Sequence, residues 1–277
     1  MQSFKPNSFQ FLPLVIKNLL IINGLFYLAQ ITFANSTLIN IEDVFALHYV
    51  GSSLFKPWQF ITHMFMHDTN NFMHLLGNMF ALWMFGSILE NTWGSKRFLI
   101  FYIACGLGAA ALHMIFLWYD ISALQQSFAA FKQTPTYDVF IQLHKTHNLD
   151  SYFPNTLPML QEWSVNPQDK SFGMYAAEII SRYTQMHVDE ATLGASGAVF
   201  GVLAAFAYLF PNTYLYIYFL VPIKAKWVIL IYIAIELFFA LRNTAGDNVA
   251  RWAHLGGALV GFITVFIWNK TNRKTFY

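Results

Sequence analysis

Ser196 lies in surroundings that would suit an acyl-transfer nucleophile. It lies two residues after Gly194 and begins an apolar stretch in which small residues recur every four positions, at Gly197, Gly201 and Ala205. A serine in the first turn of a helix lies where free backbone N–H groups and the positive end of the helix dipole favour developing negative charge. Small residues at this spacing are also common in ordinary membrane-helix packing. This stretch alone therefore leaves both interpretations open.

A histidine near the end of the chain could act as the base for this serine. His254, Gly257 and Gly261 fall at positions i, i+3 and i+7, so the imidazole shares one helix face with a strip of glycines. Another backbone can approach such a face closely, and the small face that begins at Ser196 is complementary to it. We therefore predict that these two helices touch along their glycines and place His254 beside Ser196.

A second polar pair could stabilise an oxyanion. His74 and Asn78 are four residues apart and project from one face of a predicted helix. Imidazole and carboxamide groups inside an apolar helix are costly unless they face the protein interior or a water-filled cavity. Both can donate hydrogen bonds to an anionic oxygen, as an oxyanion hole requires. The alternative is a structural hydrogen bond between membrane helices.

The composition is that of a polytopic membrane protein. The 277 residues are 56% hydrophobic, 18% aromatic and only 11% charged, whereas soluble domains average about 25% charged residues. The net charge of +2 with scattered basic residues does not suggest nucleic acid binding. Cys105 is the single cysteine, so an internal disulfide is impossible and redox chemistry is not expected.

Apolar stretches divide the chain into spans and connections. We predict six membrane helices at about 12–34, 72–90, 98–119, 193–210, 227–241 and 251–268. The first could instead be a cleaved signal peptide with a weak processing site at 33–36. Residues 35–71 are expected to lie in the membrane interface, and 214–226 are expected to form an interfacial return. The predicted parts are thus 1–119 with helices one to three, an extracytoplasmic insertion at 120–190, and 191–277 with helices four to six.

Charge asymmetry predicts the orientation in the cell membrane. One side of the six-span arrangement has eight lysines and arginines in its short segments, and the other side has three, so the positive-inside rule places both termini in the cytoplasm. Lys5, Arg273 and Lys274 contribute to the larger count. The four polar groups described above then lie in the outer two turns of their helices, at similar depth.

Several other polar residues receive no catalytic role. Fragments 137–148 and 174–187 of the insertion are amphipathic and predict helices, and its histidines are expected to be solvated. These histidines are His144, His147 and His187. His113 is interpreted as structural, and Glu236 as a costly carboxylate that faces the bundle or reaches towards Arg242.

Taken together, these residues resemble the rhomboid family of intramembrane serine proteases. The resemblance rests on Trp58 and the second span, the His74 and Asn78 pair, the Gly194–Gly197 stretch, and His254 with its glycines. It implies an all-α bundle of six transmembrane helices, with a large insertion between helices three and four that departs from the minimal family pattern. It also implies membrane protein substrates and no cofactor or metal.

The resemblance also implies a role for each site residue. Ser196 and His254 would form a catalytic dyad, in which no carboxylate is needed to orient the imidazole. His74, Asn78 and the Ser196 backbone N–H would bind the oxyanion. Four further positions would contribute around them: Gly194 would admit the substrate carbonyl, Gly197 and Gly257 would allow close helix packing, and Phe200 would stack on the imidazole.

Three alternatives remain. A catalytically inactive relative would keep the fold and bind membrane clients. A membrane metalloenzyme would use His63, His67 and His74 as ligands, although no further ligand completes a recognisable spacing locally. A small-solute transporter would show inverted repeats and interrupted helices, which this sequence does not display. The oligomeric state is not predicted.

Overall fold

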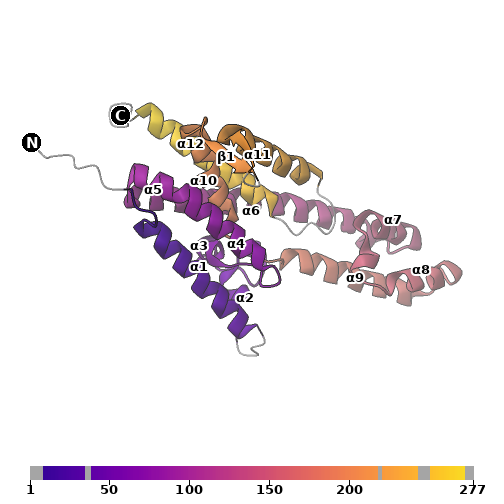
Figure 1. Ribbon diagram of the computed structural model, residues 1–277. Coiled ribbons are helices and arrows are strands. Elements are labelled where there is room, and N and C mark those ends of the chain that lie inside the picture. Colours follow the sequence, from indigo (N-terminus) through magenta and orange to yellow (C-terminus); the bar gives the residue numbers. More distant parts are fainter. Residues whose placement is uncertain (1–8, 35–38, 218–219, 243–249, 272–277) are drawn as a thin grey trace, which may run out of the picture.

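The computed structural model describes residues 9–34, 39–217, 220–242 and 250–271, and most of these residues are helical (Figure 1). Several residues used above lie outside this range, namely Asn35, Ser36, Lys5, Arg273 and Lys274. The elements are α1 (Leu14–Phe33), α2 (Ile41–Phe45), α3 (Gln59–Thr62), η1 (His63–Phe65), α4 (Phe72–Ala81), η2 (Leu82–Gly86), α5 (Ser87–Trp93), α6 (Ser95–Gln133), α7 (Tyr137–His147), η3 (Leu149–Ser151), α8 (Thr156–Val165), α9 (Lys170–Val188), α10 (Ser196–Leu209), β1 (Tyr214–Ile217), β2 (Val221–Lys224), α11 (Ala225–Arg242) and α12 (Arg251–Thr271).

Within the described ranges, four helical segments are long and apolar enough to cross a membrane. They are Leu14–Phe33, Phe72–Trp93, Ser95–Gln133 and Arg251–Thr271. Helix α10 is apolar but has 14 residues, about 21 Å at 1.5 Å per residue, against a bilayer core of about 30 Å. Helix α11 carries two basic residues and Glu236. The protein is therefore a membrane-embedded helical protein, and the count of six spans stays a prediction.

Helix α10 lies at the centre of the bundle, against both α6 and α12 (Figure 1). All of its residues from Gly197 to Phe206 are buried. A Cβ atom placed on Gly261 of α12 would lie 2.6 Å from the Gly201 backbone of α10, so only residues without side chains allow this approach. The helices do touch along their glycines, as the spacing of small residues predicts.

Helix α6 extends past residue 119, where the third span was predicted to end. It runs without interruption through residue 120 to Gln133, a length of 39 residues or about 58 Å. The composition becomes more polar after residue 119, but no glycine or proline occurs before Pro135, so the helix has no reason to end. The part of α6 after residue 119 turns an apolar stripe towards α7–α9, formed by Ile121, Leu124, Phe128 and Phe131.

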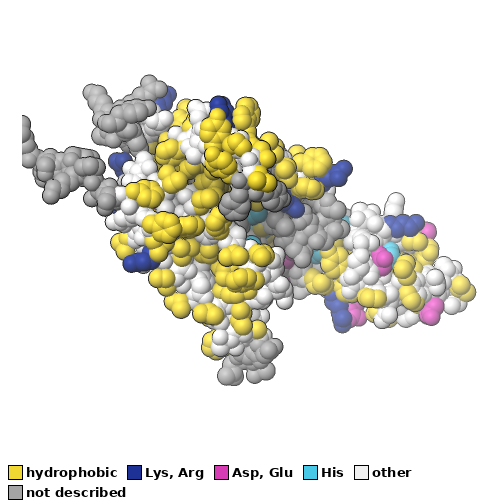
Figure 2. Space-filling model, viewed as in Figure 1, with side chains coloured by type: hydrophobic (Ala, Val, Ile, Leu, Met, Phe, Trp, Pro, Cys, Tyr) yellow, Lys and Arg dark blue, Asp and Glu magenta, His cyan; other side chains and the backbone are white. Residues whose placement is uncertain are grey.

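The insertion has a hydrophobic core of its own. Helices α7, α8 and α9 extend away from the bundle together with the end of α6 (Figure 1). The core includes Phe128, Phe131, Phe140, Trp163 and Ile180. In Figure 2 hydrophobic side chains cover much of the visible face of the bundle, whereas this end shows a more polar surface with acidic and basic groups. The two helices predicted at 137–148 and 174–187 are present as α7 and as part of α9.

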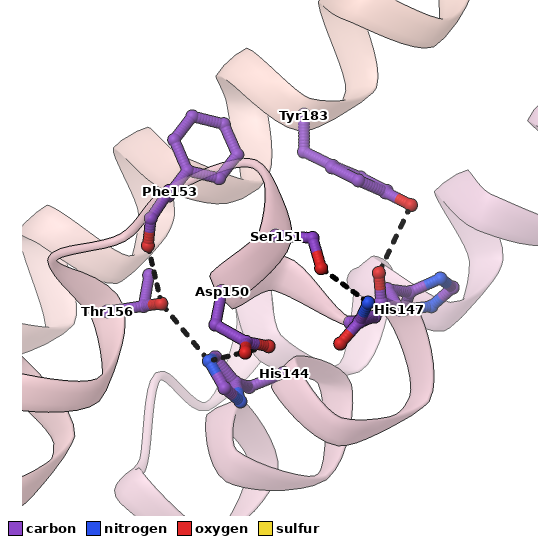
Figure 3. A network of polar contacts seen from close by, with 8 residues as sticks. His144, His147, Asp150, Ser151, Phe153, Thr156 and Tyr183 are labelled. Atoms are coloured by element: carbon purple, nitrogen blue, oxygen red, sulfur yellow. Dashed lines mark hydrogen bonds and ion pairs between the residues drawn. The ribbon is translucent and has the colours of Figure 1, made fainter. Parts of the chain in front are cut away.

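The insertion histidines are not simply solvated, which corrects the prediction. His144 is buried, and its Nε2 atom lies 3.1 Å from Thr156 Oγ1 and 3.9 Å from Asp150 (Figure 3). His147 and His187 are half-buried and pack against the Tyr183 ring. These side chains are enclosed because the insertion folds around its own core.

Two connections between the long helices have secondary structure of their own. The return after α10 is an antiparallel hairpin in which Tyr214 pairs with Lys224 and Ile217 with Val221, a strand pair that the sequence did not predict. The connection 39–71 contains the short elements α2, α3 and η1. Its Leu47 exchanges two backbone hydrogen bonds of 2.8 Å with Thr192, just before α10.

Candidate active site

Ser196 is the first residue of α10, and the segment before it is fixed from three sides. Leu47 pairs with Thr192 as described, and the His113 Nε2 atom lies 2.8 Å from Thr192 Oγ1. The Gly194 N–H donates to the His63 carbonyl oxygen at 3.0 Å, and Gly194 adopts a φ of 131°, which residues with side chains rarely adopt. His113 therefore has a structural contact, and the backbone before Ser196 is held in one conformation.

The serine and the last helix meet as predicted. Ser196 Oγ lies 2.8 Å from His254 Nε2, and His254 is in the first turn of α12. The Phe200 ring, one turn along α10, stacks on the imidazole with centroids 4.4 Å apart and planes 8° apart. The contact joins a hydroxyl to a ring nitrogen that can accept its proton.

His74 and Asn78 lie on α4, which contacts α10. A Cβ atom placed on Gly194 would lie 3.2 Å from His74 Nε2 and 3.3 Å from Ser196 Oγ, so the imidazole and the hydroxyl border the same small space. Asn78 is buried, and its Nδ2 atom donates to the His74 carbonyl oxygen at 2.8 Å. An amide has a second N–H donor, so this contact leaves one donor for another acceptor.

The structure adds a carboxylate that the sequence analysis left without a role. Glu236 of α11 is buried, and its Oε2 atom lies 2.9 Å from His254 Nδ1. Its other oxygen lies 3.4 Å from an Arg251 guanidinium nitrogen. Glu236 thus faces the bundle, and its basic neighbour is Arg251 rather than Arg242. A carboxylate in an apolar helix needs such partners, so a search for basic groups on other helices could have pointed to this pair.

The histidines considered as metal ligands do not assemble into a cluster with carboxylates or cysteine. Among the residues that the structure describes, no group of three such side chains could hold a metal ion. His67 packs against His74, whereas His63 Nδ1 lies 2.8 Å from the Gln59 carbonyl oxygen. Burial lowers the pKa of His63 and that of His67 to about 4 each, so both are neutral at pH 7.

Comparison with known proteins shows to which family the chain is related. The Rhomboid domain profile matches residues 54–125 and 171–271, together more than half of the chain. An uncharacterized mitochondrial rhomboid protein of Schizosaccharomyces pombe is 29% identical over 228 residues, 79% of this chain and 54% of that protein. RHOMBOID-like protein 12, mitochondrial, of Arabidopsis thaliana is 24% identical over 246 residues, 80% of this chain and 57% of that protein. The chain spans about half the length of these curated relatives, and it belongs to the rhomboid family.

Proposed function

We propose that this protein is an intramembrane serine endopeptidase that hydrolyses peptide bonds in or near transmembrane segments of other membrane proteins. The observation that carries the proposal is the 2.8 Å contact between Ser196 Oγ and His254 Nε2 at the start of the buried helix α10. Membership of the rhomboid family supports the same activity. No cofactor is required, because the nucleophile and its base are both side chains.

The two side chains would act in sequence. Ser196 Oγ attacks the scissile carbonyl carbon while its proton moves to His254 Nε2. The imidazolium then gives that proton to the leaving amine nitrogen as the C–N bond breaks, which leaves an acyl-enzyme. Water attacks the acyl carbon, His254 takes a proton from the water, and the proton returns to Ser196 Oγ as the acid product departs.

The space beside Gly194 would receive the oxyanion. His74 Nε2 borders it, and the Ser196 backbone N–H at the start of α10 and the second Asn78 N–H would complete the donor set. A side chain at position 194 would occupy this space, which is a second reason for glycine there besides its φ of 131°.

The substrate class follows from the location of the site. A peptide bond in a membrane helix is masked by its own hydrogen bonds, so cleavage requires local unwinding near a water-accessible surface. We expect single-span substrates with helix-weakening residues near that end and small side chains at the cut. We also propose six spans, with α10 and α11 completing the bundle, and both termini on the side opposite to Ser196.

Which membrane holds the protein is a separate question. In the cell membrane, the excess of basic residues on the side that holds both termini would place them in the cytoplasm, whereas both relatives are named as mitochondrial. Fractionation of cells that express the full chain, with protease access to tags at each terminus, decides the location and the orientation together.

The second candidate is an inactive rhomboid-like protein that binds membrane clients. The hydrogen-bonded pair of Ser196 and His254 favours the protease, because client binding requires neither side chain. The test is cleavage of a model transmembrane substrate by the full chain in liposomes, with fluorophosphonate labelling of the serine. Ser196→Ala should abolish both, and Ser87→Ala, which removes another buried serine hydroxyl, should preserve both. Undiminished cleavage by Ser196→Ala would exclude the proposed mechanism.

A further inference from the structure

We propose that Glu236 is a positioning residue for His254, so that the site works as a chain of three groups, Ser196, His254 and Glu236, rather than as a dyad. The inference rests on the proposed function and deepens it. It also departs from what the resemblance implied, since a dyad needs no acidic residue on the imidazole.

The two nitrogen atoms of His254 have different partners. Nδ1 lies 2.9 Å from Glu236 Oε2, and Nε2 lies 2.8 Å from Ser196 Oγ. An ionised carboxylate can only accept hydrogen bonds, so the imidazole donates from Nδ1. In a neutral imidazole the other nitrogen is then free of hydrogen and accepts from the serine hydroxyl. Glu236 therefore selects the tautomer that a general base needs.

The placement of Glu236 is costly unless the carboxylate has partners. It is 5% exposed and lies in the apolar helix α11, where an isolated carboxylate would be strongly disfavoured. Both oxygens have partners from the same turn of α12, because Arg251 precedes His254 by three residues. The Arg251 guanidinium also lies over the Phe239 ring at 4.9 Å, which holds it against α11.

The Glu236 carboxylate would act during the reaction, when positive charge develops on the His254 imidazole. As Ser196 attacks, the proton moves from Oγ to Nε2 and the imidazole becomes a cation. The negative charge on Glu236 stabilises that cation across Nδ1 without accepting the proton itself. The Phe200 ring on the imidazole face and the Glu236 contact at its edge together restrict the ring to one orientation.

If Glu236 had only a structural role, it would stabilise the packing of α11 against α12 without affecting the chemistry of His254. An isosteric substitution distinguishes this role from the proposed positioning role. Glu236→Gln keeps the volume, and its NH₂ group can donate to Nδ1. That contact favours hydrogen at Nε2, the tautomer that cannot accept from Ser196. We expect kcat to fall by at least about 100-fold, towards the loss of about 10,000-fold that replacement of a triad carboxylate by its amide causes, with KM within about twofold of wild type.

A conservative variant and a matched control complete the experiment. Glu236→Asp keeps the charge with a shorter reach, so kcat should recover to at least about tenfold above Glu236→Gln while remaining below wild type. Glu90→Gln changes another buried glutamate, one that accepts from the Val15 and Ile16 N–H groups at 2.9 Å. It should lower Tm and leave kcat within about twofold of wild type, because its contacts lie on α1 and on Ser95 at the start of α6, away from Ser196.

The outcomes distinguish this inference from the proposed function. If wild type cleaves, Ser196→Ala does not, and Glu236→Gln keeps full kcat, the role of Glu236 is overturned and the protease stands. If wild type fails to cleave, or Ser196→Ala cleaves, the proposed function itself fails. If Glu236→Gln loses its cooperative unfolding transition, that variant is not folded and its kcat cannot be interpreted. The kcat and Tm of Glu236→Asp then test the role of Glu236. A kcat of Glu236→Asp that is more than about twofold below wild type at unchanged Tm supports the role, and a kcat within about twofold of wild type overturns it.

Discussion

Gly257 of α12 lies with its backbone directly against the backbone of Gly197 in α10. A Cβ atom on Gly257 would overlap the Gly197 carbonyl oxygen, so no side chain fits without separating the helices. Gly257 is one turn from His254, and Gly197 follows Ser196 directly. The distance between the proposed nucleophile and its base is therefore set by two residues that have no functional group.

The first prediction follows from this contact. Gly257→Val should push α12 away from α10 and lower kcat by at least about 100-fold, since a displacement of 1 Å between reacting groups can cost that much. The measurement is cleavage of a transmembrane substrate in liposomes. Gly24→Val is the matched control, because a Cβ atom on Gly24 meets no atom within 4 Å. Equal activity of the two variants would show that the glycine contact does not position the site.

The second prediction concerns the oxyanion donors. Asn78→Ala removes a buried amide whose remaining N–H would bind the developing oxyanion. We expect kcat to fall by about 10- to 1,000-fold with little change in KM, because the donor acts mainly in the transition state. Steady-state kinetics and Tm are measured together. A large fall in Tm with unchanged kcat would instead assign Asn78 to helix packing through its contact with the His74 carbonyl.

The helix contact at the site could be predicted because it depends on short-range periodicity. Positions i, i+3, i+4 and i+7 share a helix face whatever the rest of the fold does. Small residues on that face allow a close approach, which the Gly201 and Gly261 backbones make. This spacing predicted that the two helices touch, and the similar depth of Ser196 and His254, together with the family resemblance, predicted the contact between the two side chains.

Features that depend on distant partners could not be predicted in the same way. Polar composition after residue 119 indicated a boundary, yet α6 continues to Gln133, because a helix ends where its backbone can no longer continue. Glu236 has its partners on α12, so no local spacing relates it to His254. His144 is buried because α8 and η3 fold against α7, a contact that its own helix does not encode.

The third prediction tests the separate core of the insertion. Phe131 on the extended end of α6 is fully buried and packs against Phe140 with centroids 5.6 Å apart. Phe131→Ala should lower the free energy of unfolding of this region by about 3–5 kcal/mol. Limited proteolysis between residues 134 and 189 follows the opening of the insertion. Lys132→Ala, at the exposed neighbouring position, should leave the proteolysis rate unchanged.

The last prediction concerns acid stability through His63. Burial lowers its pKa to about 4, below the value of 6.5 for an exposed histidine, so the folded state binds fewer protons than the unfolded chain between these two values. Stability from this group is therefore complete above pH 6.5 and falls as the pH drops towards 4, by about 3 kcal/mol. The His63 carbonyl oxygen accepts from the Gly194 N–H, so unfolding here releases the backbone before Ser196.

The measurement compares wild type with His63→Asn, whose amide can still donate to the Gln59 carbonyl oxygen but does not titrate. Tm is followed from pH 7.5 to pH 4 in the same detergent. Wild type should lose Tm more steeply below pH 6.5 than the variant. His67 has a similarly lowered pKa and contributes to both slopes, so it cancels in the difference. Parallel curves would show that His63 does not remain neutral in the folded protein, and an earlier acid loss in the variant would show that the imidazole protects the fold.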